Sequence, residues 1–84
     1  MNYMYILKSK KDSQLYLGST TDLRKRLKEH NEGGVFSTKS RKPFELVYYE
    51  AYKSEYDARR REASLKLRSR AFAQLKKRIA DSTK

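Results

Sequence analysis

An 84-residue chain with a net charge of +11 and no cysteine is long enough for one domain and excludes disulfides and cysteine-based zinc sites. Its apolar runs fall far short of the roughly 18 residues that a membrane-spanning helix requires. The charge favours a polyanionic partner, above all nucleic acid, over a merely soluble basic protein. The N-terminal stretch lacks a signal-peptide pattern, and we expect a cytoplasmic location without membrane attachment.

Two short apolar runs open the chain, YMYIL at residues 3–7 and LYLGS at residues 15–19. The polar segment between them predicts a β-hairpin. We expect Gly18 to be a structural turn residue that leads into the next element, since glycine adopts backbone conformations that other residues resist. Tyr16 shares a strand face with Gly18, so its ring can reach the same margin of the sheet.

The segment 22–31 has helical spacing and carries an unusual density of cationic side chains. On a helical wheel, Leu23 and Leu27 form the buried edge. Arg26 and His30 lie one turn apart beside that edge, so we expect them at the margin of the sheet. Spacing alone also allows the plainer interpretation of an arginine lying along the core surface and an inert histidine.

The second half of the chain begins with FELVYYEAY, residues 44–52, which is its strongest strand pattern. Simple alternation places Phe44, Leu46 and Tyr48 on one face and Val47, Tyr49 and Ala51 on the other, so both faces should be covered. Helices are predicted over 54–67, where Ser54 and Asp57 resemble a capping box, and over about 70–80, where Ser69 can act as the cap.

These elements predict an α/β fold in the order ββαβαα. It consists of a small three-stranded mixed or antiparallel sheet flanked by about three helices. We expect residues 1–84 to form a single domain, with a frayed tail at about 80–84.

Several short motifs together resemble the GIY-YIG nuclease superfamily. YMY at 3–5 corresponds to the first tripeptide, with Tyr5 as its last residue, and YLG at 16–18 corresponds to the second. The helix DLRKRLKEH supplies the family's arginine, Arg26, and four residues later His30. The segment YDARRREASLK supplies the family's glutamate, Glu62. The chain is most similar to small stand-alone bacterial members, which resemble the N-terminal domain of the excision-repair endonuclease C subunit.

The resemblance implies a metal-dependent endonuclease that hydrolyses phosphodiester bonds in DNA, in repair or in processing of structured DNA. It implies Tyr5, Tyr16, Arg26, His30 and Glu62 as catalytic residues. Glu62 is the implied ligand of one divalent ion, Mg²⁺ or Mn²⁺. Arg26 would offset charge on the phosphate, and one of the tyrosines would take a proton from water. The choice of base between Tyr5 and Tyr16 stays open.

Glu62 has a second interpretation that does not involve a metal. With Lys66 it forms an i, i+4 pair in the favourable orientation, as Glu55 does with Arg59. Such alternating charges are typical of a solvated row of salt bridges along one face of a helix.

The contacts expected with DNA are mainly to phosphates, because no segment resembles a base-reading helix. The residues expected to make them are Lys39, Arg41 and Lys42, in a basic loop at 35–43 that we expect to be exposed, and Arg59 and Arg60 on the following helix.

Two alternatives remain beside the nuclease. One is a catalytically weak or inactive nucleic-acid-binding module on the same fold, favoured because the asparagine that many members place near the end of the domain has no clear counterpart. The only asparagines are Asn2 and Asn31. The other is a basic RNA- or ribosome-associated protein, which fits the charge but leaves the set of five site residues unexplained.

Overall fold

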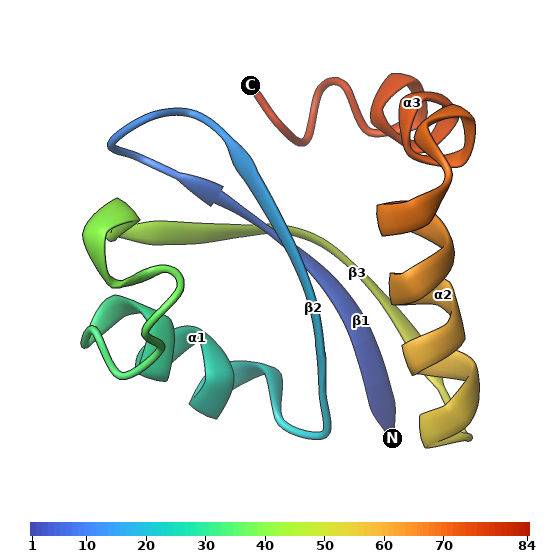
Figure 1. The fold of residues 1–84 in the computed structure, drawn as a ribbon, viewed down its shortest axis with the longest axis horizontal. Helices are drawn as coiled ribbons and strands as arrows, with labels where there is room; N and C mark the ends of the chain where they lie inside the picture. The colour runs from blue at the N-terminus through green and yellow to red at the C-terminus, as the bar shows by residue number, and fades with distance from the viewer.

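Three antiparallel strands and three α-helices form the molecule (Figure 1). The computed structural model describes the backbone of residues 1–84 and every side chain except that of Ser69. The elements follow the predicted order ββαβαα, with one added 3₁₀ turn, η1. They are β1 (Asn2–Ser9), β2 (Leu15–Thr20), α1 (Leu23–Asn31), η1 (Lys39–Arg41), β3 (Phe44–Tyr52), α2 (Glu55–Leu67) and α3 (Ser69–Arg78).

The sheet has β1 at its centre, in the order β2-β1-β3, and both pairings are antiparallel. Helix α1 lies on one side of it, and α2 lies on the other side with α3 (Figure 1). Because both faces are covered, the middle of β1, from Met4 to Leu7, is buried without a break. A run of four buried residues is therefore compatible with a central strand here, although the sheet is antiparallel.

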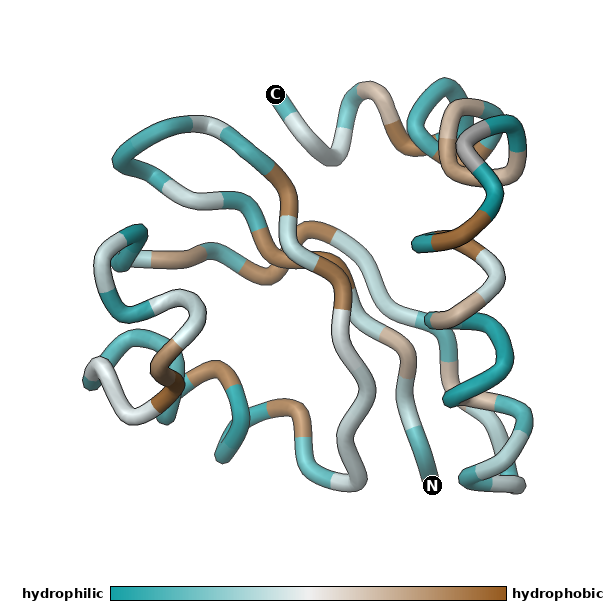
Figure 2. The backbone as a smooth tube through the Cα atoms, viewed as in Figure 1, coloured by the Kyte–Doolittle hydropathy of each residue, from teal (hydrophilic) through white to brown (hydrophobic). Residues whose placement is uncertain are grey.

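Two apolar cores result, one on each face of the sheet. Hydrophobic residues, coloured brown on the backbone tube, occur along the middle of the strands and recur in the helices (Figure 2). The core beneath α2 and α3 contains Met4, Ile6, Leu17, Leu65, Leu75 and Ile79. The smaller core beneath α1 contains Tyr5, Leu7 and Phe44, packed against Tyr16, Leu23, Leu27 and Leu46. The residues of the predicted site lie over this smaller core and along its edge.

The predicted assignment of faces in β3 holds for Leu46 and Val47, which pack on opposite sides of the sheet, and is wrong from Tyr48 onward. The register shifts between Ile6 and Leu7, which pair with Tyr48 and Leu46, so Val47 is an extra residue in the ladder. A bulge of this kind reverses the alternation of side chains in the rest of the strand. Leu46 consequently packs on the α1 side, whereas Tyr48 packs on the α2 side.

Helix α2 is fixed to the sheet by a partly buried ionic cluster as well as by its apolar face. Its first turn is capped as predicted, since the Ser54 hydroxyl accepts a hydrogen bond from the backbone N–H of Asp57 at 3.3 Å. Arg61 donates to both oxygens of Glu50, at 2.9 and 3.2 Å. The hydroxyls of Tyr48 and Tyr52 donate to the same carboxylate, at 2.7 and 2.6 Å. This cluster sets the rotation of α2 and thereby the direction in which the neighbouring Glu62 points.

Helix α3 starts at Ser69 and ends at Arg78, two residues before its predicted end. The predicted capping role of Ser69 concerns a side chain outside the described part of the structure. Of the helices that the structure describes, none combines the length and the apolar character needed to cross a bilayer.

The Glu50 cluster predicts a defined loss of stability in acid. Burial raises the pKa of Glu50, but hydrogen bonds from Arg61, Tyr52 and Tyr48 outweigh burial and hold this pKa below its ordinary value of 4.5. The stabilisation is therefore complete above pH 4.5 and is lost as the pH falls through the lowered value. We expect Glu50→Gln to lower the free energy of unfolding by about 1.5–3 kcal/mol at pH 7.

Urea denaturation of the wild type and of Glu50→Gln between pH 3 and pH 7 checks this. The difference between the two proteins should shrink as the pH falls below about 4.5. Glu45→Gln, at an exposed position of the same strand, is the matched control. A difference that stays constant over the whole pH range would contradict the role given to Glu50.

Candidate active site

The site begins with a close packing of Tyr5 on Gly18. The two residues are cross-strand partners in β1 and β2. A Cβ atom on Gly18 would overlap the hydroxyl and the ring of Tyr5. The phenol ring therefore passes directly over the backbone of β2 toward the edge of the sheet, and only glycine leaves it room.

The prediction of a turn at Gly18 is wrong. Strand β2 continues to Thr20, and Asp22 is the N-cap of α1, so the turn into the helix lies after Gly18. The backbone of Gly18 has no positive φ, so conformational freedom does not explain the residue. The requirement for glycine is steric and comes from the neighbouring strand.

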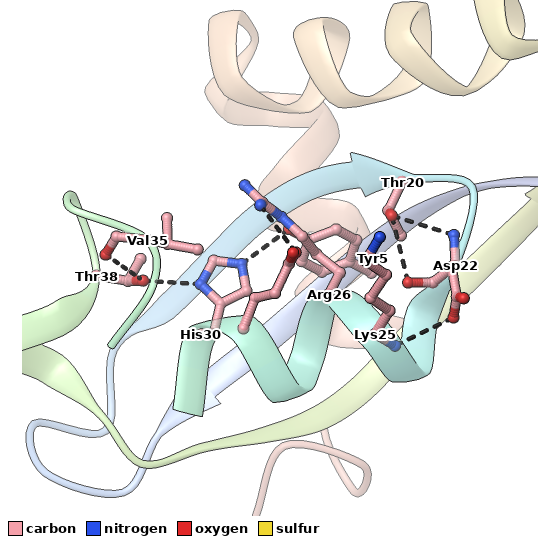
Figure 3. A network of polar contacts seen from close by, with 9 residues as sticks. Tyr5, Thr20, Asp22, Lys25, Arg26, His30, Val35 and Thr38 are labelled. Atoms are coloured by element: carbon pink, nitrogen blue, oxygen red, sulfur yellow. Dashed lines mark hydrogen bonds and ion pairs between the residues drawn. The ribbon is translucent and has the colours of Figure 1, made fainter. Parts of the chain in front are cut away.

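His30, on α1, is the hydrogen-bond partner of the Tyr5 hydroxyl. The imidazole is completely buried and lies in the last turn of α1. Its Nε2 lies 3.0 Å from the Tyr5 hydroxyl, and its Nδ1 lies 2.7 Å from the hydroxyl of Thr38 (Figure 3). The ring also makes edge contacts with Tyr16 and Phe44, at centroid distances of 5.1 and 5.7 Å. Both ring nitrogens therefore have a hydrogen-bond partner, and aromatic rings pack against the edges of the imidazole.

Arg26, one turn before His30, brings a permanent positive charge to this group. Its guanidinium pairs with Glu29 at 3.3 Å and adjoins the Tyr5 hydroxyl. Burial raises the pKa of Tyr5, and the neighbouring Arg26 only partly offsets this. Burial also lowers the pKa of His30, and the charge of Arg26 adds to that effect. At neutral pH the pair is therefore an uncharged phenol beside an uncharged imidazole.

Glu62 approaches the same edge of the sheet from α2. Its Oε2 atom lies 2.6 Å from Lys66 Nζ, and this ammonium group lies 5.9 Å from the centre of the Tyr16 ring. The charge of Glu62 contributes to the raised pKa of Tyr5, which places the carboxylate within electrostatic reach of the phenol. The structure thus brings the five predicted site residues to one edge of the sheet, four of them on the α1 side and Glu62 on α2.

The donor set fits an open metal site and does not fit a closed one. Among the described residues, no three histidine, aspartate or glutamate side chains lie close enough to enclose an ion. Glu62 has one oxygen committed to Lys66, and its Oε1 makes no hydrogen bond within the described part of the chain. One free carboxylate oxygen suits Mg²⁺ or Mn²⁺, which readily take their remaining ligands from water and substrate phosphate.

A cleft of about 470 Å³ adjoins the site and separates the first turns of α1 and α2. Its floor includes Ser19 and Thr20 at the exposed edge of β2, and its walls include Arg26 on one side and Arg59 on the other. The carboxylates of Asp22, Glu29 and Glu55 also line the cleft, and Glu29 and Glu55 pair with these two arginines. A phosphate group between the two guanidinium groups would therefore compete with Glu29 and Glu55 for them.

The predicted DNA-binding residues differ in the exposure of their side chains and in whether they form ion pairs. Lys39 and Lys42 are exposed in the segment between α1 and β3, and Arg60 is exposed on α2 over the ring of Tyr56. Arg59 pairs with Glu55 at 3.0 Å but stays largely exposed.

The expectation that Arg41 is exposed is wrong. Its guanidinium pairs with Asp12 at 3.0 Å and lies over the ring of Phe44, and only 25% of the side chain is exposed. The charge is thereby committed to holding the β1–β2 loop against the start of β3, because the ion pair and the ring contact are made within the fold. Arg41 is therefore a structural residue.

Thr38 is the residue of the site that sequence reasoning missed. The segment 35–43 reads as an exposed basic loop, yet Thr38 is completely buried and contacts His30 directly. A small polar residue in an irregular segment carries no periodic signal, so only the return of the loop onto α1 shows its place.

Comparison with known proteins agrees with the motifs. The model of the GIY-YIG catalytic domain matches residues 1–78. A UPF0213 protein of Clostridium perfringens is 48% identical over 67 residues, which cover 79% of this chain and 71% of that protein. A UPF0213 protein of Syntrophus aciditrophicus is 47% identical over 72 residues, which cover 83% and 82% of the two chains. No solved structure matches.

The packing of Tyr5 on Gly18 predicts that a single methyl group disrupts the site. We expect Gly18→Ala to lower the free energy of unfolding by about 1–3 kcal/mol, because the Tyr5 ring must move. The same movement should separate the phenol from His30 and should shift the ¹H and ¹⁵N signals of the imidazole. Thermal unfolding and NMR of the ring check both effects. Ser19→Ala, the next position of the strand, is the control and should leave the imidazole signals unchanged.

Proposed function

The chain belongs to the GIY-YIG family, and from that premise we propose that it is a divalent-metal-dependent endonuclease that hydrolyses phosphodiester bonds in DNA. We place this activity in the cytoplasm, in repair or processing of structured DNA. The observation that carries the proposal is the Tyr5–His30 hydrogen bond of 3.0 Å beside Arg26, whose guanidinium group also lines the cleft. A protein that only binds phosphates needs no hydrogen-bonded phenol–imidazole pair next to the arginine of its cleft.

Arg26 is the residue suited to the charge of the phosphate. Its guanidinium has five donors in a rigid fork, of which one is used by Glu29. The others can hold non-bridging oxygens, whose negative charge increases in the transition state. Lysine supplies the charge without the fork, so the geometry of the group is as important as its charge.

The attacking water must lose a proton, and Tyr5 with His30 is the pair placed to accept it. The raised pKa of Tyr5 means that the phenol is not ionised at neutral pH. Tyr5 can therefore act as a base only if its own proton has somewhere to go at the same time. His30 Nε2, at 3.0 Å, is such an acceptor. Tyr16, packed on the edge of the same imidazole, has no comparable partner among the described residues.

Glu62 is proposed as the protein ligand of the metal. When bound, Mg²⁺ or Mn²⁺ supplies Lewis-acid stabilisation of the phosphate and of the leaving oxygen. The task of Glu62 is to present one oxygen, while Lys66 holds the other and fixes the rotamer of the carboxylate.

Binding of DNA is proposed to depend on exposed cations outside the catalytic group. Lys39 and Lys42 lie in the segment between α1 and β3, Arg59 and Arg60 lie on α2, and all four side chains are exposed. Contacts of this kind are to phosphates and depend steeply on salt.

A second function is a binding module that no longer cleaves DNA. The contact of 2.6 Å between Glu62 and Lys66 favours it, because an ammonium group already neutralises the expected metal ligand. The use of Asn31 also favours it. This side chain is fully occupied in bridging to the backbone of Phe44, at 2.6 and 3.1 Å, and is not available to a substrate.

Nicking of supercoiled plasmid and of a labelled branched DNA, at low salt with Mg²⁺ or Mn²⁺, separates the two functions. We expect cleavage by the wild type and a loss of on the order of a thousandfold or more in Glu62→Ala, because several kcal/mol of transition-state stabilisation disappear. EDTA should abolish the activity. Glu45→Ala, at an exposed position of β3 that does not line the cleft, is the control carboxylate and should stay active.

Cleavage that persists in Glu62→Ala would show that Glu62 is not the ligand. Salt-sensitive binding without cleavage of either substrate would favour the binding module.

The phosphate contacts predict a change in the salt dependence of binding. If Lys39 and Lys42 each neutralise a phosphate, the double variant Lys39→Ala/Lys42→Ala should reduce the slope of log K against log salt by about 2. Fluorescence anisotropy between 50 and 200 mM salt measures this slope. Lys77→Ala, on α3 at the opposite side of the sheet, is the charge control. An equal loss of slope per lysine removed in the control would show diffuse binding without a defined path for the strand.

A further inference from the structure

Thr38 does more than fill space beside the active site. We propose that Thr38 is a positioning residue that holds His30 as the Nδ1–H tautomer, with the lone pair of Nε2 directed at the Tyr5 hydroxyl. The observation is a chain of four groups, from Tyr5 through His30 and Thr38 to the carbonyl of Val35, in a buried part of the molecule (Figure 3).

The first argument comes from Tyr5. Its hydroxyl belongs to a side chain that is 2% exposed, so its proton requires an acceptor inside the protein. Arg26, which adjoins the hydroxyl, can only donate. Among the described residues, His30 Nε2 is the one acceptor within hydrogen-bond distance, at 3.0 Å. If Nε2 carried a proton, the phenol oxygen would face two donors and its own proton would have no partner.

The second argument comes from Thr38. Its hydroxyl has a single proton, and the carbonyl of Val35 lies 3.4 Å from the oxygen. The same carbonyl already accepts from the backbone N–H of Thr38 at 3.1 Å, and 3.4 Å is long for a hydroxyl donor, so this contact permits Thr38 to donate to it but does not require it. With its proton so directed, the hydroxyl oxygen, 2.7 Å from His30 Nδ1, accepts the Nδ1–H proton. The surroundings of Thr38 are therefore compatible with the tautomer that Tyr5 requires.

The direction of the hydrogen bonds decides the direction in which protons can move. This step, the attack of water on the phosphodiester, rests on the proposed function. The water oxygen forms a bond to phosphorus as its proton passes to the Tyr5 oxygen, while the phenolic proton passes to His30 Nε2. The bridging P–O bond breaks with its electron pair on the leaving oxygen, which takes a proton from solvent. The imidazolium keeps Nδ1–H on Thr38, and Tyr5 is never present as a free phenolate.

The chain offers an unusually direct test because His30 is its only histidine. In protein labelled with ¹⁵N-histidine, the two ring nitrogens can be assigned without ambiguity. We expect the wild type at pH 7.5 to show a protonated Nδ1 and an unprotonated Nε2. A wild type in which Nε2 carries the proton would overturn the proposal. This measurement requires neither a metal nor a substrate.

Two substitutions separate the role in orientation from a role in packing. Thr38→Val has nearly the same shape but no hydroxyl, so His30 Nδ1–H loses its acceptor and the Nε2–H tautomer should become populated. Thr38→Ser restores the hydroxyl and should restore the wild-type ring signals, even if both variants lose some thermal stability. A Thr38→Val protein that keeps the Nδ1–H tautomer would contradict the proposal.

If the proposed nuclease activity is present, Thr38→Val should cleave about tenfold to a hundredfold more slowly than Thr38→Ser, by analogy with other residues that orient a functional histidine. Equal rates in the two variants would refute the positioning role. A protein that cleaves no DNA but shows the Nδ1–H tautomer, lost in Thr38→Val, would support the inference about Thr38 while the proposed function fails.

Discussion

The passage of the Tyr5 ring over Gly18 is the contact on which the candidate site depends. A strand interior normally has a side chain at each position, and any Cβ at Gly18 would block the phenol. With that space open, a residue of the central strand reaches past the edge strand and meets His30 on α1. The hydrogen-bonded pair, the position of Arg26 beside it and the buried contact with Thr38 all follow from this one crossing.

The two faces of the sheet supply different parts of the site. The α1 face contributes an aromatic, largely uncharged group in which burial keeps both the phenol and the imidazole neutral. The α2 face contributes the carboxylate, held in direction by Lys66 and, one residue away, by the Arg61–Glu50 cluster. Only one strand, the edge strand β2, lies between the two groups. A phosphate at this edge can therefore contact both.

Charge has at least two distinct uses in this chain. Some cations are committed inside the fold, as Arg41 is to Asp12 and Arg61 is to Glu50, and these contribute to stability. Others, such as Lys39, Lys42 and Arg60, are exposed and form no ion pair within the described part of the chain, so their charges are available to an anionic partner. Not every lysine and arginine behind the net charge of +11 is therefore available to a partner. Their positions in the fold distinguish the paired cations from the exposed ones.

The amino-acid sequence by itself determined the order of the elements, the family and five side chains that meet at the candidate site, because these depend on periodicity and on short motifs at fixed spacing. Arg26 and His30 on one side of a helix follow from 3.6 residues per turn. The tertiary structure alone decided why Gly18 is a glycine, where the alternation in β3 reverses, that Arg41 is withdrawn from the surface and that Thr38 contacts His30. Each of these depends on a neighbour from another part of the chain: the phenol ring of Tyr5, the bulge in β3 opposite β1, Asp12 in a distant loop, or His30 eight residues away. A local sequence pattern does not contain information about such neighbours.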